Sequence, residues 1–238
     1  MCRAAKSCMG SLLRDRTEAG KRLARELMRY AMRRDVLVLA LPRGGVPVGF
    51  EVARALGVPL DVFVVRKLGM PFHEELAMGA IASGGAQLLN EDVIQTYAIS
   101  EDEIDRVIES ERRELERRER LYRGDRPFPT LKDRIVILVD DGLATGSTMR
   151  AAVMALRDES PARIVVAVPV AAKDTCQQFE DVADEIVCLE TPEPFDAVGL
   201  WYQNFAQTSD EEVHDLLARC RIASRDIRPP RSSATIRH

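Results

Sequence analysis

The 238-residue sequence lacks any apolar stretch near the length of a membrane span, which is about 20 residues. Its N-terminus is basic but has no apolar run typical of a signal peptide. The cysteines (Cys2, Cys8, Cys176, Cys188, Cys220) are scattered and lack the paired spacing of a zinc site or a disulfide framework. We therefore expect reduced thiols in a soluble, cytoplasmic protein without a membrane partner.

The sequence also lacks a strong charge of one sign. Its 34 basic residues against 38 acidic ones give −4, so bulk charge does not favour nucleic-acid binding. The histidines His73, His214 and His238 are too dispersed for a shared metal site, and "HEE" at 73–75 has no second histidine four residues on, as a zinc protease would need. We expect them at the surface.

What the sequence does contain is a series of short apolar runs rich in Val and Leu. An amphipathic helix is predicted over Arg16–Met32. The apolar runs lie at 35–42, 58–67, 133–141, 162–171 and 184–190, and helical stretches follow at 46–56, 148–158 and 173–179. Alternating buried strands and helices predict an α/β fold with a central parallel sheet flanked by helices.

Two segments break this alternation. Residues 90–124 are predicted helical and densely charged, with a narrow apolar stripe of Ile104, Val107, Ile108, Leu115 and Leu121. We interpret this segment as a solvated helical insertion packed on the sheet, and a homodimer arm is the alternative. The basic tail 221–238 has little to bury and is predicted to be largely disordered.

The stretch "VILVDDGLATGST" (136–148) places two carboxylates at the end of a buried strand. Adjacent buried acids repel each other and lose hydration, a cost that is tolerated when cations or hydroxyl groups satisfy them. Glycines and hydroxyls follow directly, and amides at such a turn before a helix form an anion nest. Acids and nest together suit a sugar phosphate. The alternative is an ordinary turn and helix cap.

This stretch resembles the phosphoribosyl pyrophosphate (PRPP) binding motif of type I phosphoribosyltransferases. The wider chain is similar to a bacterial group of predicted phosphoribosyltransferases over about residues 10–220. The resemblance implies that Asp140 and Asp141 hold the ribose hydroxyls, directly or through Mg²⁺. It implies that the loop holds the 5-phosphate, through Ala144, Thr145, Gly146, Ser147 and Thr148. Purine-salvage members have an aspartate at the position of Ala144, so the base-contacting acid of those enzymes is missing.

Two further loops carry cations. "LPRGGVPVG" (41–49) offers Arg43 as a fork for phosphate oxygens and Gly44 and Gly45 for close backbone approach, and matches the family's pyrophosphate loop, often with a cis peptide. "VVRKLGMPFHEELAMGAIASGG" (64–85) is predicted as a mobile segment whose Lys67, and secondarily Arg66, reach the leaving pyrophosphate. The alternatives are a plain glycine turn and surface ion pairs.

The segment 190–220 follows the last predicted strand, where family members build a hood over the base. Phe195 and Trp201 are candidate base contacts, because flat aromatic faces stack on bases. The alternative is that the aromatics form the hood's own small core. The predicted organisation is a core at 1–189, a hood at 190–220 and a tail at 221–238.

The resemblance implies an enzyme that uses PRPP and Mg²⁺ and transfers ribose 5-phosphate to a nitrogen nucleophile, a nucleobase or related small molecule, with release of pyrophosphate. Asp140, Asp141, Arg43 and Lys67 are the expected catalytic residues, and Asp140 and Asp141 the expected Mg²⁺ ligands, in part through water. Nucleotide metabolism is the expected context. The rival interpretation is a regulatory protein that binds PRPP or a nucleotide without chemistry.

Overall fold

The computed structural model describes residues 12–70 and 73–226. Its centre is a five-stranded parallel sheet in the order β2-β1-β6-β7-β8. The strands are β1 (Val36–Ala40), β2 (Leu60–Val62), β6 (Ile135–Val139), β7 (Arg163–Val170) and β8 (Glu185–Glu190). The predicted α/β fold with a central parallel sheet is confirmed.

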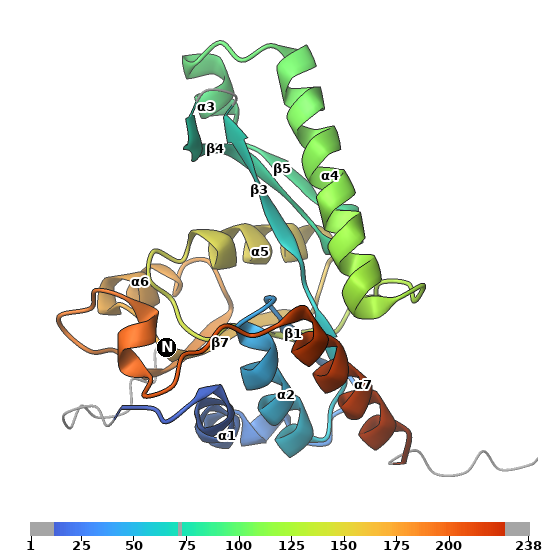
Figure 1. Ribbon diagram of the computed structural model, residues 1–238, viewed down its shortest axis with the longest axis vertical. Helices are drawn as coiled ribbons and strands as arrows, with labels where there is room; N and C mark the ends of the chain where they lie inside the picture. The colour runs from blue at the N-terminus through green and yellow to red at the C-terminus, as the bar shows by residue number, and fades with distance from the viewer. Residues whose placement is uncertain (1–11, 71–72, 227–238) are drawn as a thin grey trace, which may run out of the picture.

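Helices cover both faces of this sheet (Figure 1). Three of them lie on one face: α1 (Arg16–Glu26), α2 (Gly45–Leu56) and α7 (Asp210–Asp226). The other face is covered by α5 (Ser147–Asp158) and α6 (Lys173–Gln178). Along β1, Val36, Val38 and Ala40 enter the first core, whereas Leu37 and Leu39 enter the second. A strand buried on both faces explains the unbroken apolar run in the sequence.

A second, antiparallel sheet, which the sequence did not predict, stands beyond α5 (Figure 1). It consists of β3 (Val65–Met70), β4 (His73–Ala82) and β5 (Gln87–Leu89), so the segment predicted as a mobile loop is largely strand. The single strand predicted over 58–67 was wrong, because it divides into β2 and β3. Phe63 and Val64, between the two strands, are buried in opposite cores as in a continuous strand, which is why the sequence pattern showed a single apolar run. Because β4 is rich in alanine and glycine, the alternation of apolar and polar residues typical of a strand could not be recognised in its sequence.

The predicted helical insertion is present as α3 (Glu91–Thr96) and α4 (Glu101–Arg123). Within α4, Ile104, Ile108 and Leu115 are buried, but Leu121 is 40% exposed and Tyr122 is buried instead. The helix lies mainly along β3, β4 and α7, and its main contact with the central sheet is at the edge strand β2. The expectation that its stripe packs on the central sheet therefore needs correction, since the antiparallel sheet provides most of its support.

Three smaller differences concern the chain ends and the cysteines. The opening helix ends at Glu26 and a 3₁₀ turn follows (η1, Met28–Tyr30). Helix α7 continues to Asp226, so the predicted tail is helical at its start, and residues 227–238 lie outside the described residues.

Cys176 and Cys188 are joined by a disulfide, contrary to the expected reduced thiols, because α6 and β8 bring both into one core. Two further 3₁₀ turns are η2 (Ser83–Gly85) and η3 (Val198–Trp201).

None of the helices in residues 12–70 and 73–226 combines the length and apolar character needed to cross a membrane.

Arg123 joins α4 to the central sheet. Its Nε lies 3.2 Å from Asp61 Oδ1, its Nη1 donates to Glu119 at 3.0 Å and its Nη2 donates to the Val62 carbonyl at 3.0 Å. The Arg123 side chain is 3% exposed, so these contacts are shielded from water. The centre of the Phe128 ring lies 5.0 Å from its guanidinium carbon.

We predict that Arg123→Met lowers the free energy of unfolding by about 3–5 kcal/mol, because it leaves the buried Asp61 carboxylate without its cation. Urea denaturation followed by circular dichroism measures the change. Arg113→Met, which removes an exposed pair with Glu109 on the same helix, is the matched control and should cost less than about 1 kcal/mol. Equal losses in both variants would contradict the assigned role.

Candidate functional site

The carboxyl ends of β1 and β6 bring two of the predicted loops side by side. The strands are parallel neighbours, with Ala40 opposite Val139, and Leu41 N donates to the Val139 carbonyl at 2.9 Å. Loop 41–45 follows β1 and loop 140–147 follows β6. Ligands of open parallel sheets bind at this edge, so the topology places both loops where a common ligand can reach them.

Asp140 and Asp141 follow β6 directly and are both half-buried. Asp140 Oδ1 accepts a hydrogen bond from Asp141 N at 2.9 Å. Burial, reinforced by the charge of Asp141, raises the pKa of Asp140 well above its usual value. Burial also raises the pKa of Asp141, while nearby Arg16 opposes that rise. The pair is therefore an acidic centre that favours a bound cation or hydroxyl donor.

The loop after β1 touches this acid pair through its glycines. A Cβ atom at Gly44 would overlap the carboxylate of Asp141, and one at Gly45 would lie 2.7 Å from the Val139 carbonyl and 2.9 Å from Asp140 Cα. Only glycine permits so close an approach. The Pro42–Arg43 peptide bond is cis. Thus the loop predicted for pyrophosphate lies against the acids predicted for ribose.

Arg43 lies at the rim of this loop, with 37% of its side chain exposed. Its Nη1 is 3.8 Å from Asp210 Oδ1 at the start of α7. Asp210 Oδ1 also accepts from the Tyr122 hydroxyl at 2.6 Å, and burial together with this bond raises the pKa of Tyr122 to about 12. Within the described part of the chain, Asp210 is the one ion-pair partner of this guanidinium, which leaves its exposed side available to a ligand.

The loop from Ala144 to Thr148 exposes its donors and is supported from beneath. Ala144, Thr145, Ser147 and Thr148 are exposed, and α5 begins at Ser147 after Gly146, whose φ is 69°. The Thr175 hydroxyl donates to the Ala144 carbonyl at 2.6 Å. A Cβ at Gly146 would lie 2.7 Å from Phe179 and 2.9 Å from Thr175 Cγ2, so α6 packs directly under the turn. No sequence pattern pointed to this role of Thr175, which lies 31 residues from Ala144.

Lys67 and Arg66, adjacent on β3, have different surroundings. Lys67 is exposed and lines a cavity of about 730 Å³ together with Thr145, Ser147 and Arg150. Arg66 instead donates from Nε and Nη2 to Glu111 Oε2 of α4, at 2.6 and 2.5 Å. The structure therefore brings Lys67 to the loop 144–148 that is predicted to hold the 5-phosphate (the phosphate loop), and it pairs Arg66 with the helical insertion.

Arg16, which sequence reasoning missed, contacts the acid pair. Its Nε and Nη2 both lie 2.8 Å from Asp141 Oδ2, and the two side chains are 11% and 15% exposed. Arg16 is the first residue of α1 and is 125 residues away from Asp141 in the chain. No spacing rule distinguishes it from the other arginines of that helix.

The hood aromatics pack mainly on one another. Phe195 and Trp201, with Val198 and Phe205, surround a small core of Leu13, Ala19, Val170 and Tyr202. The Tyr202 hydroxyl donates to the Asp141 carbonyl at 2.6 Å, and burial raises its pKa above the usual range. Trp201 Nε1 is buried without a hydrogen-bond partner among the described residues.

The hood also includes the N-terminal segment. Leu13 pairs with Tyr202 in a parallel bridge, and Leu13 N donates to the Trp201 carbonyl at 3.0 Å. Gln203 N donates back to the Leu13 carbonyl at 2.8 Å. The hood therefore joins residues near both ends of the described chain.

The carboxylates of Asp140 and Asp141 suit a magnesium ion that is also bound by the phosphate groups of a ligand. Within residues 12–70 and 73–226 no group of three or more His, Cys, Asp or Glu side chains forms a metal cage. Mg²⁺ is commonly bound through one or two carboxylates together with substrate phosphates and water. Asp140 and Asp141 fit that requirement. His214 is a surface residue, with its side chain 57% exposed.

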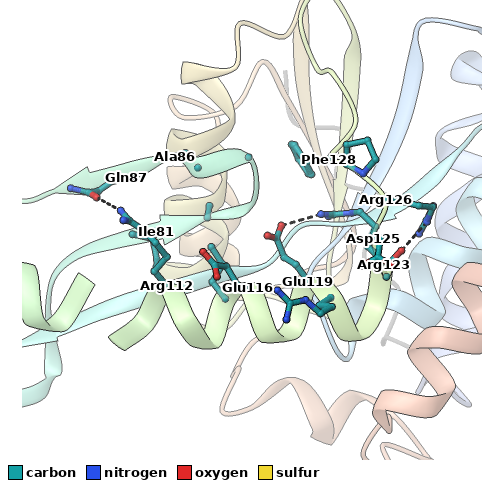
Figure 2. A pocket seen from close by; sticks show the side chains of 17 residues that line it. Ile81, Ala86, Gln87, Arg112, Glu116, Glu119, Arg123, Asp125, Arg126 and Phe128 are labelled. Carbon is teal, nitrogen blue, oxygen red and sulfur yellow. Dashed lines mark hydrogen bonds and ion pairs between the residues drawn. The ribbon is translucent and has the colours of Figure 1, made fainter. Parts of the chain in front are cut away.

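A second cavity, of about 560 Å³, lies between α4 and the turn from β4 to β5 (Figure 2). Its charged lining is largely paired within the protein: Arg112 approaches Gln87 at 3.4 Å, and Arg123 donates to Glu119 (Figure 2). Arg126 donates to the Arg123 carbonyl at 2.9 Å. None of the predicted site residues lines it, so it is separate from the acid pair and its loops.

Three comparisons bear on this site. The model of the phosphoribosyl transferase domain family matches residues 11–203. Two relatives from Mycobacterium tuberculosis, named "Putative phosphoribosyl transferase" Rv0571c (strain ATCC 25618 / H37Rv) and MT0597 (strain CDC 1551 / Oshkosh), are each 47% identical over 208 residues. The match covers 87% of this chain and 47% of each relative, so the chain spans about half the length of these curated relatives.

The crystal structure of TT1426 from Thermus thermophilus is 41% identical, with a TM-score of 0.78, and the match covers 87% of this chain and 98% of that one. The fold is therefore shared with a solved relative. Since the family model covers most of the chain and all of the loops that converge at the carboxyl edge, this chain belongs to the phosphoribosyl transferase domain family.

Proposed function

We propose that this protein transfers ribose 5-phosphate from PRPP to a nitrogen nucleophile and releases pyrophosphate. The observation that carries the proposal is the meeting of two loops, one after β1 and one between β6 and α5, at one edge of the sheet. The acids after β6, the glycines after β1 and the exposed donors before α5 are the parts that a sugar bearing both a phosphate and a diphosphate requires.

The sugar and its 5-phosphate bind the loop after β6. The amides and hydroxyls of Ala144–Thr148 hold the phosphate, favoured by the positive end of the α5 dipole. One oxygen of each acid is occupied by the protein, since Asp140 Oδ1 accepts from Asp141 N and Asp141 Oδ2 accepts from Arg16. The second oxygen of each carboxylate is left to accept from the ribose 2- and 3-hydroxyls. Because the 5-phosphate is held at a distance from ribose C1, its binding positions the sugar for attack at that carbon.

Asp140 and Asp141 would also hold Mg²⁺, directly or through water. When bound, the ion supplies positive charge that stabilises the phosphate oxygens of the substrate.

The leaving pyrophosphate is stabilised by groups on two elements. As the bond from ribose C1 to the pyrophosphate oxygen breaks, negative charge grows on the diphosphate and positive charge on the sugar ring. Arg43 and the amides of Gly44 and Gly45 stabilise that negative charge from the loop after β1. We assign Lys67, which lines the cavity beside Thr145 and Ser147, as a further cation that reaches the diphosphate from β3. Arg66 is left out of this step, because Glu111 already binds its guanidinium.

The acceptor is a small molecule with a nucleophilic nitrogen, which forms the new bond to C1 and loses a proton. Ala144 stands where purine-salvage enzymes have an aspartate, so the loop offers no acid to the base. Phe195 and Trp201 remain candidate stacking residues, since each keeps part of its surface exposed while packing in the hood.

Calorimetry followed by an assay of pyrophosphate release tests the function. The protein is titrated with PRPP in the presence of Mg²⁺ and then incubated with PRPP and a panel of purines, pyrimidines and simple amines. We expect micromolar binding and release that depends on one acceptor class. Binding without acceptor-dependent release would favour a regulatory protein, and affinity indifferent to the diphosphate would favour a sugar-phosphate binding protein.

We predict that Asp140→Asn and Arg43→Ala each reduce turnover about a hundredfold, because each removes a charged contact that is stronger in the transition state. Steady-state assays of pyrophosphate release measure the change, and circular dichroism checks the fold. Arg157→Ala, which removes an exposed pair with Asp184 away from the site, should retain wild-type activity. Wild-type turnover in both site variants would contradict the assignments.

We predict that Thr175→Val weakens binding of PRPP about fivefold, because the lost hydrogen bond to the Ala144 carbonyl contributes about 1 kcal/mol to holding the phosphate loop. Titration calorimetry measures the dissociation constant. Thr130→Val makes the same change at an exposed position in the segment before β6 and should bind like wild type. Unchanged affinity in Thr175→Val would show that α6 does not support the loop.

A further inference from the structure

Arg16 contacts three residues in two parts of the molecule, Asp141 in the loop after β6 and the adjacent Phe205 and Ala206 in the hood. Its Nε and Nη2 reach Asp141 Oδ2 at 2.8 Å. Its Nη1 donates to the Ala206 carbonyl at 2.7 Å, and its guanidinium carbon lies 3.9 Å from the centre of the Phe205 ring. Each terminal nitrogen of the fork, and its flat face, therefore has a defined partner.

These contacts fix the direction of the guanidinium. Asp15 caps α1 by accepting from Glu18 N at 2.7 Å, which sets the first turn of the helix at Arg16. The Phe205 ring is itself packed against Tyr202, with ring centres 5.0 Å apart. The backbone of Arg16 is fixed by α1, its guanidinium plane by Phe205 and its Nη1 by Ala206. Its Nε and Nη2 can therefore bind the Asp141 carboxylate in only one orientation.

Asp141 is held by the hood on its main chain as well. The Tyr202 hydroxyl donates to the Asp141 carbonyl at 2.6 Å, next to the residues that contact Arg16. Gly44 packs against the same carboxylate oxygen that Arg16 binds, so that oxygen is enclosed by protein. The carboxylate can therefore present only its other oxygen, Oδ1, to a ligand.

We propose that Arg16 is a positioning residue of the PRPP site: it fixes the rotamer of Asp141, so that one oxygen faces the ribose, and ties that orientation to the hood through Phe205 and Ala206. The proposal rests on the proposed function, since it assigns the freed oxygen to PRPP. Arg16 itself does not touch the substrate. If Arg16 only stabilised the fold, its replacement would weaken PRPP binding equally whether or not residue 141 carries a carboxylate.

The test is a double-mutant cycle on the full chain, with the dissociation constant of PRPP in the presence of Mg²⁺ measured by calorimetry. We expect Arg16→Gln to raise the constant about 30-fold, since a misoriented Asp141 loses its hydrogen bond to the ribose, and a hydrogen bond to a charged group is typically worth about 10- to 150-fold in affinity. In an Asp141→Asn background, Arg16→Gln should add less than about twofold, because the residue it positions is already lost. The matched control is Arg22→Gln on the same helix as Arg16, which breaks the 2.5 Å pair with Glu190 of β8 and should bind like wild type.

Arg16→Lys keeps the charge but lacks the fork, and we expect about tenfold weaker binding with a wild-type thermal unfolding temperature. This variant provides the test if Arg16→Gln does not fold. The inference is overturned if Arg16→Lys binds like wild type, or if Arg16→Gln costs as much in the Asp141→Asn background as in wild type. Failure of the wild-type protein to bind PRPP would overturn the proposed function and this inference with it.

Discussion

The close packing of two neighbouring carboxylates against a glycine loop is the constraint on which the rest of the site depends. Asp140 and Asp141 repel each other and are both half-buried, so each loses part of its hydration. The protein meets that cost with one backbone amide and one arginine, and it admits Gly44 and Gly45 at distances that no side chain tolerates. The sequence of loop 41–45 and the placement of α1 both follow from this requirement.

The distribution of charge around the acids has a chemical logic. The centre of the site is acidic, whereas Arg43, Lys67 and the amides before α5 provide positive charge at its rim. A sugar that becomes positive between a phosphate and a departing diphosphate has the complementary pattern. Helix α6 supports the rim from below through Thr175 and Phe179, so the exposed donors of the phosphate loop rest on a packed core.

Features local in sequence could be predicted, and features made by distant residues could not. The strands β1, β6, β7 and β8 were recognisable because both of their faces are buried, and the acids and glycines of the phosphate loop lie within a single short stretch, 136–148. The antiparallel sheet was missed because Ala77, Gly79, Ala80 and Ala82 carry little hydrophobic contrast along β4. Arg16 and Thr175 were missed because tertiary packing alone brings them to their loops.

The hood was expected as a lobe formed after residue 190, but Leu13 and Arg16 are as much a part of it as Tyr202 and Phe205. This construction has a consequence for synthesis on the ribosome. Asp141 emerges 61 residues before Tyr202 and still earlier than Ala206, so a nascent or truncated chain can form the phosphate loop while the acid pair still lacks its outer support. The support of the acid pair is therefore complete only after Ala206 has been synthesised.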